Sequence, residues 1–236
     1  MSTEPGAKVL EYANKKRGTI VRRKGRPKNQ EAQCWDLPEE ALDRAGAKTS
    51  WMHFQEQRKA GKAGADDFGK DNYEYVWGKP VEIGSSMAGD IIQFRDHKQK
   101  YEANFDFTVG KGREVFNCSD DIRVETRGPQ HSAIVLKRLA SGWVAVLEQH
   151  VRRPKPARST VTGRGTVFLK PGQFETVEND TISGKWVSRM KRRMVSKDCR
   201  NLVDRIAKNF SGPVRVRIRA QAKTSGIATI YRPQKR

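Results

Sequence analysis

The sequence predicts an α+β protein in which helices come first and an antiparallel sheet follows. Apolar residues recur at helical spacing within residues 1–45 and again near residue 200, whereas most of the chain after residue 75 carries short runs rich in Val, Ile and aromatic residues. Helices and strands that are segregated in this way are typical of α+β architectures. The length of 236 residues fits one medium domain, or one domain with additional segments.

Two amphipathic helices are expected near the N-terminus. Over residues 8–16 three apolar residues recur at helical spacing, and Gly18 ends the pattern. A second helix is expected over residues 34–45, because one proline lies in its first turn and Gly46 supplies a C-terminal stop. Residues 55–74 are polar and rich in glycine, so they are expected to form a surface excursion.

The strand signals follow in a series. They lie at residues 75–77, 89–94, 101–109, 131–136, 143–148, 165–169, 214–218 and 227–231. Between the last groups, residues 186–210 predict a helical insertion with a basic exposed face, and two prolines in residues 152–158 indicate a basic linker. We therefore expect residues 1–150 to form the core. Residues 151–236 would add the linker, the insertion and the closing strands of the same domain.

The charge of the chain is strongly positive and concentrated in blocks. There are 47 Lys and Arg against 27 Asp and Glu, and the formal charge is +20 at pH 7. Such a field attracts phosphate polymers or anionic surfaces, so we expect a polyanion as partner: RNA, DNA or an anionic cell wall. The alternative is that the charge only keeps the protein in solution. The residues expected to bind the polyanion are Arg22, Arg23, Lys24, Arg26 and Lys28 in a loop, and Arg189, Lys191, Arg192 and Arg193 in the insertion.

The chain lacks the signals of membrane insertion, export and metal binding. No apolar run approaches the roughly 18 residues of a membrane-spanning helix, and the first ten residues do not resemble a signal peptide. Cys34, Cys118 and Cys199 are odd in number and widely spaced, which is typical neither of a disulfide framework nor of a zinc site. We expect a cytoplasmic or virion-associated protein with no metal or cofactor, in which Cys118 and Cys199 are buried free thiols.

Cys34, His131 and Glu148 are the candidate catalytic residues. Cys34 is predicted at the start of a helix, where backbone N–H groups and the helix dipole favour a thiolate. A base beside the thiol and an acid that orients this base would complete the arrangement used in cysteine catalysis. His53 and His97 lie in polar contexts and are interpreted as solvated.

A hairpin is predicted by the strand signals on either side of residues 139–142. With tight pairing around this turn, Glu148 faces Ala133 and is the diagonal neighbour of His131 on the same sheet face. Diagonal neighbours lie about 7–8 Å apart, so Glu148 would accept a hydrogen bond from Nδ1 of His131 and leave the other nitrogen for Cys34. A slip of one residue would place the two side chains on opposite faces, as ordinary polar groups near a turn.

Several motifs resemble, in their order and spacing, the CHAP branch of the NlpC-like cysteine amidase/peptidase superfamily. They lie at residues 33–49, 75–78, 89–94, 131–135, 146–150 and 231–233. The resemblance implies a papain-like fold in which the nucleophile opens a helix that packs on a small antiparallel sheet. It assigns the nucleophile to Cys34, the base to His131 and the orienting acid to Glu148. It also adds His150 to the catalytic set, at a position where relatives carry Asn.

Two functions follow from these observations. The first is a cysteine amidohydrolase or peptidase that cuts amide bonds, as family members commonly do in peptidoglycan, and that carries a basic polyanion-binding surface. The alternative is a non-catalytic component of a nucleic-acid-rich assembly, such as a ribosome-like particle or a virion, because a catalytic fold can be reused as a scaffold. The three candidate catalytic residues favour the enzyme, and the basic blocks favour the assembly component. A phage-type lysin would combine the two.

Overall fold

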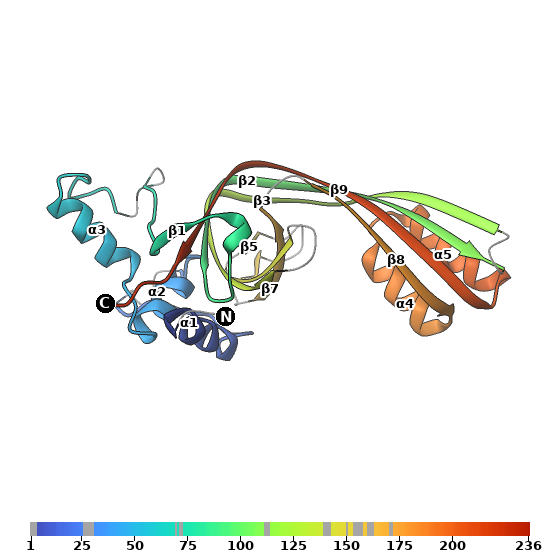
Figure 1. Ribbon diagram of the computed structural model, residues 1–236, viewed down its shortest axis with the longest axis horizontal. Coiled ribbons are helices and arrows are strands. Elements are labelled where there is room, and N and C mark those ends of the chain that lie inside the picture. The colour runs from blue at the N-terminus through green and yellow to red at the C-terminus, as the bar shows by residue number, and fades with distance from the viewer. Residues whose placement is uncertain are drawn as a thin grey trace. The chain divides into compact units, whose positions relative to one another are not determined.

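The structure, a computed structural model, is of the mixed α and β class that the sequence predicts (Figure 1). It describes residues 4–25, 31–68, 70, 73–110, 114–138, 143–149, 151–152, 158–159, 163–169 and 172–236. None of the helices within these ranges is long and apolar enough to cross a membrane.

Among the described residues, three helices come first, and two more helices interrupt the strands that follow, as the sequence predicts in outline. In chain order the elements are α1 (Glu4–Lys15), α2 (Asp36–Arg44), α3 (Ser50–Lys59), β1 (Lys79–Val81), the 3-10 helix η1 (Ile83–Ser85), β2 (Ile91–Val109), β3 (Glu114–Arg138), β4 (Trp143–Glu148), β5 (Val151–Arg152), β6 (Arg158–Ser159), β7 (Gly163–Phe168), β8 (Gly172–Ile182), α4 (Gly184–Arg193), α5 (Lys197–Asn209) and β9 (Gly212–Arg232). The main sheet has the order β1-β9-β2-β3-β4-β7, with β8 paired to β9, and β5 pairs with β6 separately.

The chain forms two compact units that interleave along the sequence. Unit 1 comprises Met1–Lys98, Thr126–Leu169 and Ser225–Arg236, and unit 2 comprises Gln99–Glu125 and Lys170–Thr224. The strands β2, β3 and β9 therefore each contribute residues to both units. The boundary expected at residue 150 lies inside unit 1.

The sheet of unit 1 is buried on both faces. Neighbouring side chains of a strand point to opposite faces, and accordingly Ile91 and Ile134 join one apolar cluster while Ile92 and Val135 join another. The first of these clusters also contains the inward faces of α1 and α2 (Val9, Ala13, Leu37, Ala41 and Leu42). The predicted amphipathic helices thus cover this face of the sheet, although α1 begins four residues earlier than expected and α2 two residues later.

Unit 2 is a sheet with two helices on one face (Figure 1). Buried side chains of β9 alternate with exposed arginines, so Val214, Val216 and Ile218 face α4 and α5 while the intervening residues point to solvent. Phe105 and Phe107 of β2 complete this core together with Trp186 of α4. The single helical insertion that we expected is therefore a pair of helices, α4 and α5, separated by a short turn.

Several strand predictions were wrong in extent. Residues 75–77, expected as a strand, are not in one, and residues 55–59, expected in the surface excursion, belong to α3. The two strands expected over 89–109 are one continuous strand, β2, and those expected over 214–231 are likewise one strand, β9. The middle sections of both strands are polar, at residues 96–100 in β2 and at residues 223–226, which end in a glycine, in β9. Local propensity therefore suggested breaks that pairing with neighbouring strands overrides.

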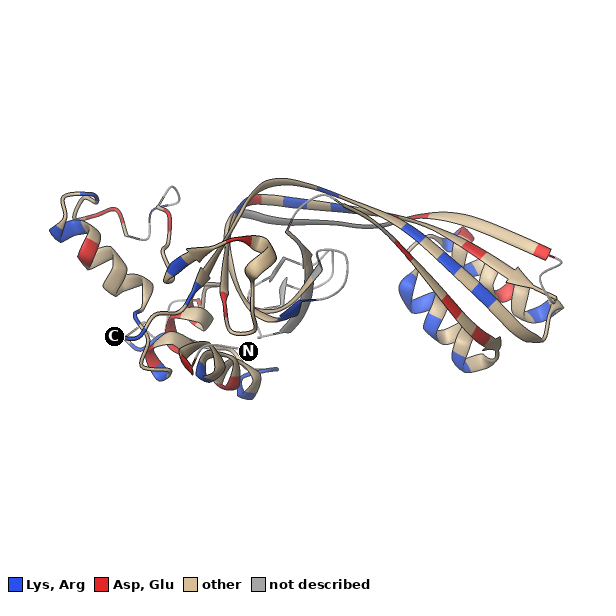
Figure 2. Ribbon diagram, in the orientation of Figure 1, with Lys and Arg blue, Asp and Glu red and all other residues tan. Residues whose placement is uncertain are grey.

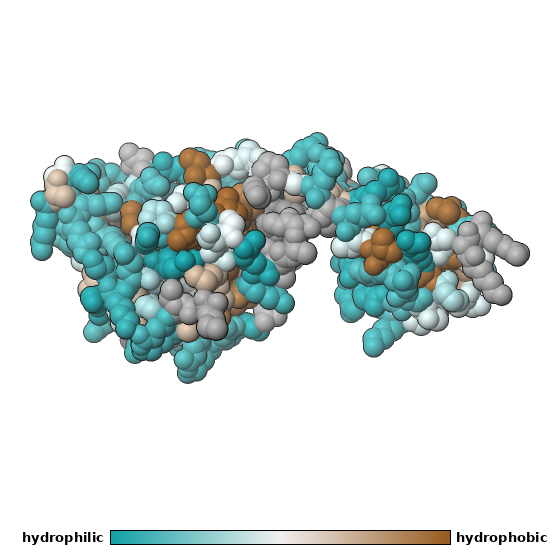
Figure 3. Space-filling view, in the orientation of Figure 1, coloured by the Kyte–Doolittle hydropathy of each residue, from teal (hydrophilic) through white to brown (hydrophobic). Residues whose placement is uncertain are grey.

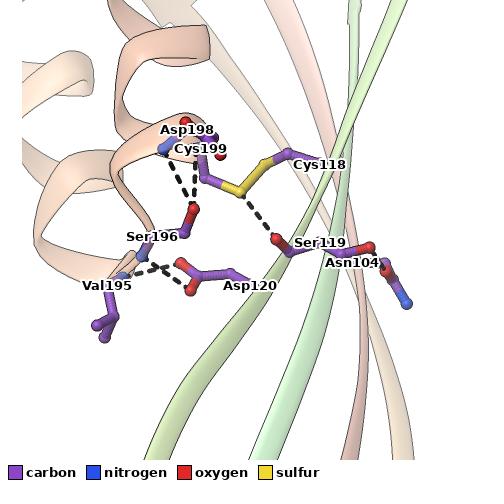
Figure 4. Close-up of a disulfide and its surroundings, with 8 residues drawn as sticks. All are labelled: Asn104, Cys118, Ser119, Asp120, Val195, Ser196, Asp198 and Cys199. Atoms are coloured by element: carbon purple, nitrogen blue, oxygen red, sulfur yellow. Dashed lines mark hydrogen bonds between the residues drawn. A yellow bond between two sulfur atoms is a disulfide. The ribbon is translucent and has the colours of Figure 1, made fainter.

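A disulfide joins two of the three cysteines, contrary to our expectation of free thiols (Figure 4). Cys118 on β3 and Cys199 on α5 are 81 residues apart in sequence, but their Cα atoms lie 5.6 Å apart, within the usual range for a disulfide. Asp120 lies beside this link and accepts hydrogen bonds from the backbone N–H groups of Val195 and Ser196 (Figure 4). The start of α5 is therefore attached to β3 by both a covalent bond and hydrogen bonds.

Candidate functional site

Cys34 lies in the turn that leads into α2, two residues before the helix begins. The carboxylate of Asp36 accepts a hydrogen bond from the N–H of Gln33 at 2.9 Å, and the Gln33 carbonyl accepts one from the N–H of Asp36 at 3.2 Å. This reciprocal pair satisfies backbone groups at the helix start, as capping residues do. Both the backbone N–H and the backbone C=O of Gln33, the residue before Cys34, are therefore hydrogen-bonded.

Gln149 supports the same turn, and sequence reasoning missed it. Its side chain is fully buried: Oε1 accepts from the N–H of Val21 at 2.7 Å, and Nε2 donates to the carbonyls of Val21 and Gln33 at 2.9 Å each. One amide therefore connects the chain before Cys34 to the end of β4. A polar residue directly after the predicted acid, Glu148, was the only local signal, and it does not specify partners more than 100 residues away.

His131 and Glu148 meet on neighbouring strands, as the predicted hairpin register requires. Glu148 is paired with Ala133 across β3 and β4, and Glu148 Oε2 lies 3.1 Å from Nε2 of His131. Both residues are about 95% buried, with exposed fractions of 5% for His131 and 4% for Glu148. A bulge between Val135 and Lys137 shifts the register by one residue toward the turn, whereas residues 139–142 are outside the described part.

The expectation that Glu148 bonds Nδ1 of His131 was wrong, because the contact is made by Nε2. Cys34 lies near the same imidazole: its side chain acts on the pKa of His131, and its Sγ lies 4.0 Å from the carbonyl oxygen of Gln130, the residue before His131. Burial by itself lowers the pKa of His131, but the hydrogen bonds and charges of Cys34 and Glu148 outweigh it and raise the pKa to about 9. A raised pKa favours the imidazolium form of His131 beside the Glu148 carboxylate.

An aromatic cluster lies beside the cysteine. The ring of Trp35 stacks on Tyr75 at 5.7 Å and meets Phe68 edge-on at 6.0 Å, and further ring contacts extend from Phe68 to Tyr73 and Phe54. Burial and then the charge of Cys34 raise the pKa of Tyr75, whereas the charge of a nearby arginine, Arg23, lowers it. Aromatic rings therefore gather at Trp35, the residue after Cys34, and the guanidinium of Arg23 lies over the Trp35 ring.

The predicted polyanion-binding residues differ in their surroundings. In unit 1, Arg22 and Lys24 are exposed, whereas Arg23 is partly buried with its guanidinium over the ring of Trp35. In unit 2, three residues of α4 are paired with carboxylates. These pairs are Arg189 with Asp180, Lys191 with Asp204 and Arg193 with Glu178. Arg192 is exposed and has no carboxylate partner among the described residues, and Arg26, Lys28 and His150 are themselves outside the described part.

Charge on the open sheet face of unit 2 is mixed rather than uniformly basic (Figure 2). Arg217 pairs with Glu175 of β8, and Arg219 pairs with Asp106 of β2, so carboxylates of neighbouring strands offset the arginines of β9. Hydrophilic side chains cover most of the surface seen in this orientation (Figure 3). The cations that remain without a carboxylate partner in the described part include Lys185 and Arg192 on α4, and Lys197, Arg200 and Lys208 on α5.

Comparisons with protein-family models, curated proteins and solved structures found no match for this chain. Within the described residues there is no group of three or more His, Cys, Asp or Glu side chains that could hold a metal ion. The assignment of a function depends therefore on the geometry around Cys34 and on the distribution of charge.

Proposed function

We propose that unit 1 is a cysteine amidohydrolase or peptidase of papain-like, CHAP-like type, with Cys34 as nucleophile, His131 as base and Glu148 as orienting acid. The observation that carries the proposal is the position of the buried His131 imidazole. It contacts Glu148 through Nε2, and Cys34 is near enough to raise its pKa, with Sγ 4.0 Å from the carbonyl oxygen of the preceding residue, Gln130. Nucleophile, base and orienter in mutual hydrogen-bond reach are the signature of an activated cysteine.

The chemistry of such a site proceeds in two stages. The Cys34 thiolate attacks the carbonyl carbon of the amide, and the His131 imidazolium donates its proton to the departing amine as the C–N bond breaks. A water molecule then attacks the resulting thioester while the neutral His131 accepts one of its protons and the C–S bond breaks, which releases the carboxylic acid and restores the thiolate–imidazolium pair. Glu148 holds the ring in place and stabilises its positive charge throughout. The backbone N–H of Cys34 is a donor for the oxyanion.

The direct test combines thiol alkylation with amide hydrolysis. At pH 7 a thiol with the ordinary pKa of about 8.5 is only about 3% thiolate, so an imidazolium partner should accelerate reaction with iodoacetamide about tenfold. We expect His131→Ala to abolish this acceleration at Cys34. We also expect the wild-type protein to release amino groups from peptidoglycan peptides, whereas Cys34→Ala should release none. Equal alkylation rates in wild type and His131→Ala would refute the catalytic assignment.

The alternative function, a basic component of a nucleic-acid-rich assembly, is favoured by the cations of unit 2 that have no carboxylate partner. Each phosphate contact contributes about 0.9 to the slope of log affinity against log salt on duplex DNA. Neutralising Lys185, Arg192 and Arg200 to Gln should therefore lower the slope by about 2.7. The matched triple variant of Arg189, Lys191 and Arg193 removes the same charge from paired residues, so it should lower the slope less.

Fluorescence anisotropy with RNA and DNA at several salt concentrations measures this slope, and a peptidoglycan pull-down runs beside it. Tight nucleic-acid binding by a protein with an unreactive Cys34 would favour the assembly component. Binding to peptidoglycan alone, with a reactive Cys34, would favour the enzyme.

A further inference from the structure

Arg23 lies over the residue that directly follows the candidate nucleophile and has no carboxylate partner among the described residues. Its Cζ atom lies 4.7 Å from the centroid of the Trp35 ring, and Trp35 directly follows Cys34. Its Nε is buried, and it has no hydrogen-bond partner in the described part of the chain. The neighbouring cations Arg22 and Lys24 are exposed, so Arg23 differs from them although all three belong to one basic run.

A buried donor without an acceptor is uncommon and destabilising. Other arginines of unit 1 avoid this cost by pairing with carboxylates: Arg44 pairs with Glu40, and Arg232 pairs with Asp90. Arg23 instead lies over an aromatic ring, which attracts the cation but provides no in-plane hydrogen-bond acceptor of the kind that a carboxylate supplies. A ligand would supply the acceptor for Nε that the described residues lack.

The thiol and the guanidinium lie near the same aromatic wall. The ring of Tyr75 stacks on Trp35 at 5.7 Å, and the hydroxyl of Tyr75 experiences the charges of both Cys34 and Arg23. A molecule that reacts at Cys34 would therefore lie within reach of Arg23. A planar guanidinium binds carboxylates through two parallel hydrogen bonds, which selects for both charge and shape.

We propose that Arg23 is a specificity-determining residue that binds a carboxylate of the substrate next to the amide attacked by Cys34. The substrate class is then an acidic amide, such as a peptide in which a residue flanking the scissile bond carries a free carboxylate. This inference rests on the proposed cysteine amidase function, and it adds the chemistry that the site recognises.

The test uses two alkylating agents of nearly equal size. Iodoacetate carries a carboxylate where iodoacetamide carries a neutral amide. With either reagent the Cys34 sulfur attacks the CH₂ carbon, an S–C bond forms and iodide leaves with the electron pair of the C–I bond. The iodoacetamide rate reports the nucleophilicity of the thiol. The ratio of the iodoacetate rate to the iodoacetamide rate reports how strongly the site attracts a carboxylate. The positive charge of His131 also affects this ratio, but it does so equally in all variants that retain His131.

We expect Arg23→Gln to lower the rate ratio about tenfold, and Arg23→Lys to lower it less because the charge remains without the planar fork. The matched control is Arg58→Gln on α3, since Arg58 also lies over an aromatic ring, 5.9 Å from the centroid of Phe54, but is exposed. This control should change the ratio less than twofold.

The two proposals can fail separately. A ratio in Arg23→Gln within twofold of the wild-type value, or an equal fall in Arg58→Gln, would overturn the carboxylate site while the iodoacetamide rate still supports the catalytic cysteine. An iodoacetamide rate at Cys34 that does not respond to His131→Ala would overturn the amidase function, and with it the substrate class.

Discussion

Replacement of Gln149 by Met tests whether a single buried amide holds the turn that presents Cys34. Met has a similar volume, so the variant removes hydrogen bonds with little change in packing. The N–H and C=O of Val21 would each lose their partner, and Val21 is only 3% exposed. The Gln33 carbonyl would keep the bond from the N–H of Asp36. Two unsatisfied buried groups at about 2 kcal/mol each predict a loss of about 4 kcal/mol in the free energy of unfolding.

Urea denaturation followed by tryptophan fluorescence measures this loss, and a thermal melt should show a Tm lowered by about 8–16 °C. The iodoacetamide rate at Cys34 should fall as well, because the peptide unit before the cysteine loses one of its anchors. Gln173→Met on β8 is the matched control, since Gln173 is exposed and its replacement should cost less than about 0.5 kcal/mol. If Gln149→Met unfolds within about 1 kcal/mol of wild type and alkylates at the wild-type rate, the anchoring role is wrong.

Three further predictions follow from the structure. Glu148→Gln should move the pKa of His131 below about 9, because a carboxylate that raises it is removed, and an NMR titration of the imidazole would show no shift if the contact is absent. In the wild type, the folded-state pKa of His131 exceeds the unfolded value of about 6.5. Protonated His131 should therefore add up to about 3 kcal/mol to the free energy of unfolding below pH 6.5, and this contribution should decline as the pH rises through about 9. Urea denaturation at several pH values should show the decline in the wild type and not in His131→Gln. Reduction of the Cys118–Cys199 disulfide, or Cys199→Ser, should destabilise unit 2 by about 4 kcal/mol on the chain-entropy estimate for an 81-residue separation, and identical melts with and without reductant would contradict it.

Local patterns in the sequence determined the two N-terminal helices and the hairpin that carries His131 and Glu148. The helical spacing of Val9 and Ala13, and the proline and glycine that bound α2, predicted two helices because each is a property of a few consecutive residues. Alternation and a short turn placed Glu148 opposite Ala133 for the same reason, and the register around the site agrees with this prediction.

Tertiary structure decided the features that depend on residues far apart in the chain. The nitrogen of His131 that meets Glu148, the amide of Gln149 that reaches Val21, and the stacking of Arg23 on Trp35 are set by how side chains pack, for which neither spacing nor composition carries a signal. The pairing of Cys118 with Cys199 likewise required β3 and α5 to fold against each other across 81 residues. Periodicity specifies which face of a helix or strand is buried, but the identity of the partner on that face is settled only when distant elements pack together.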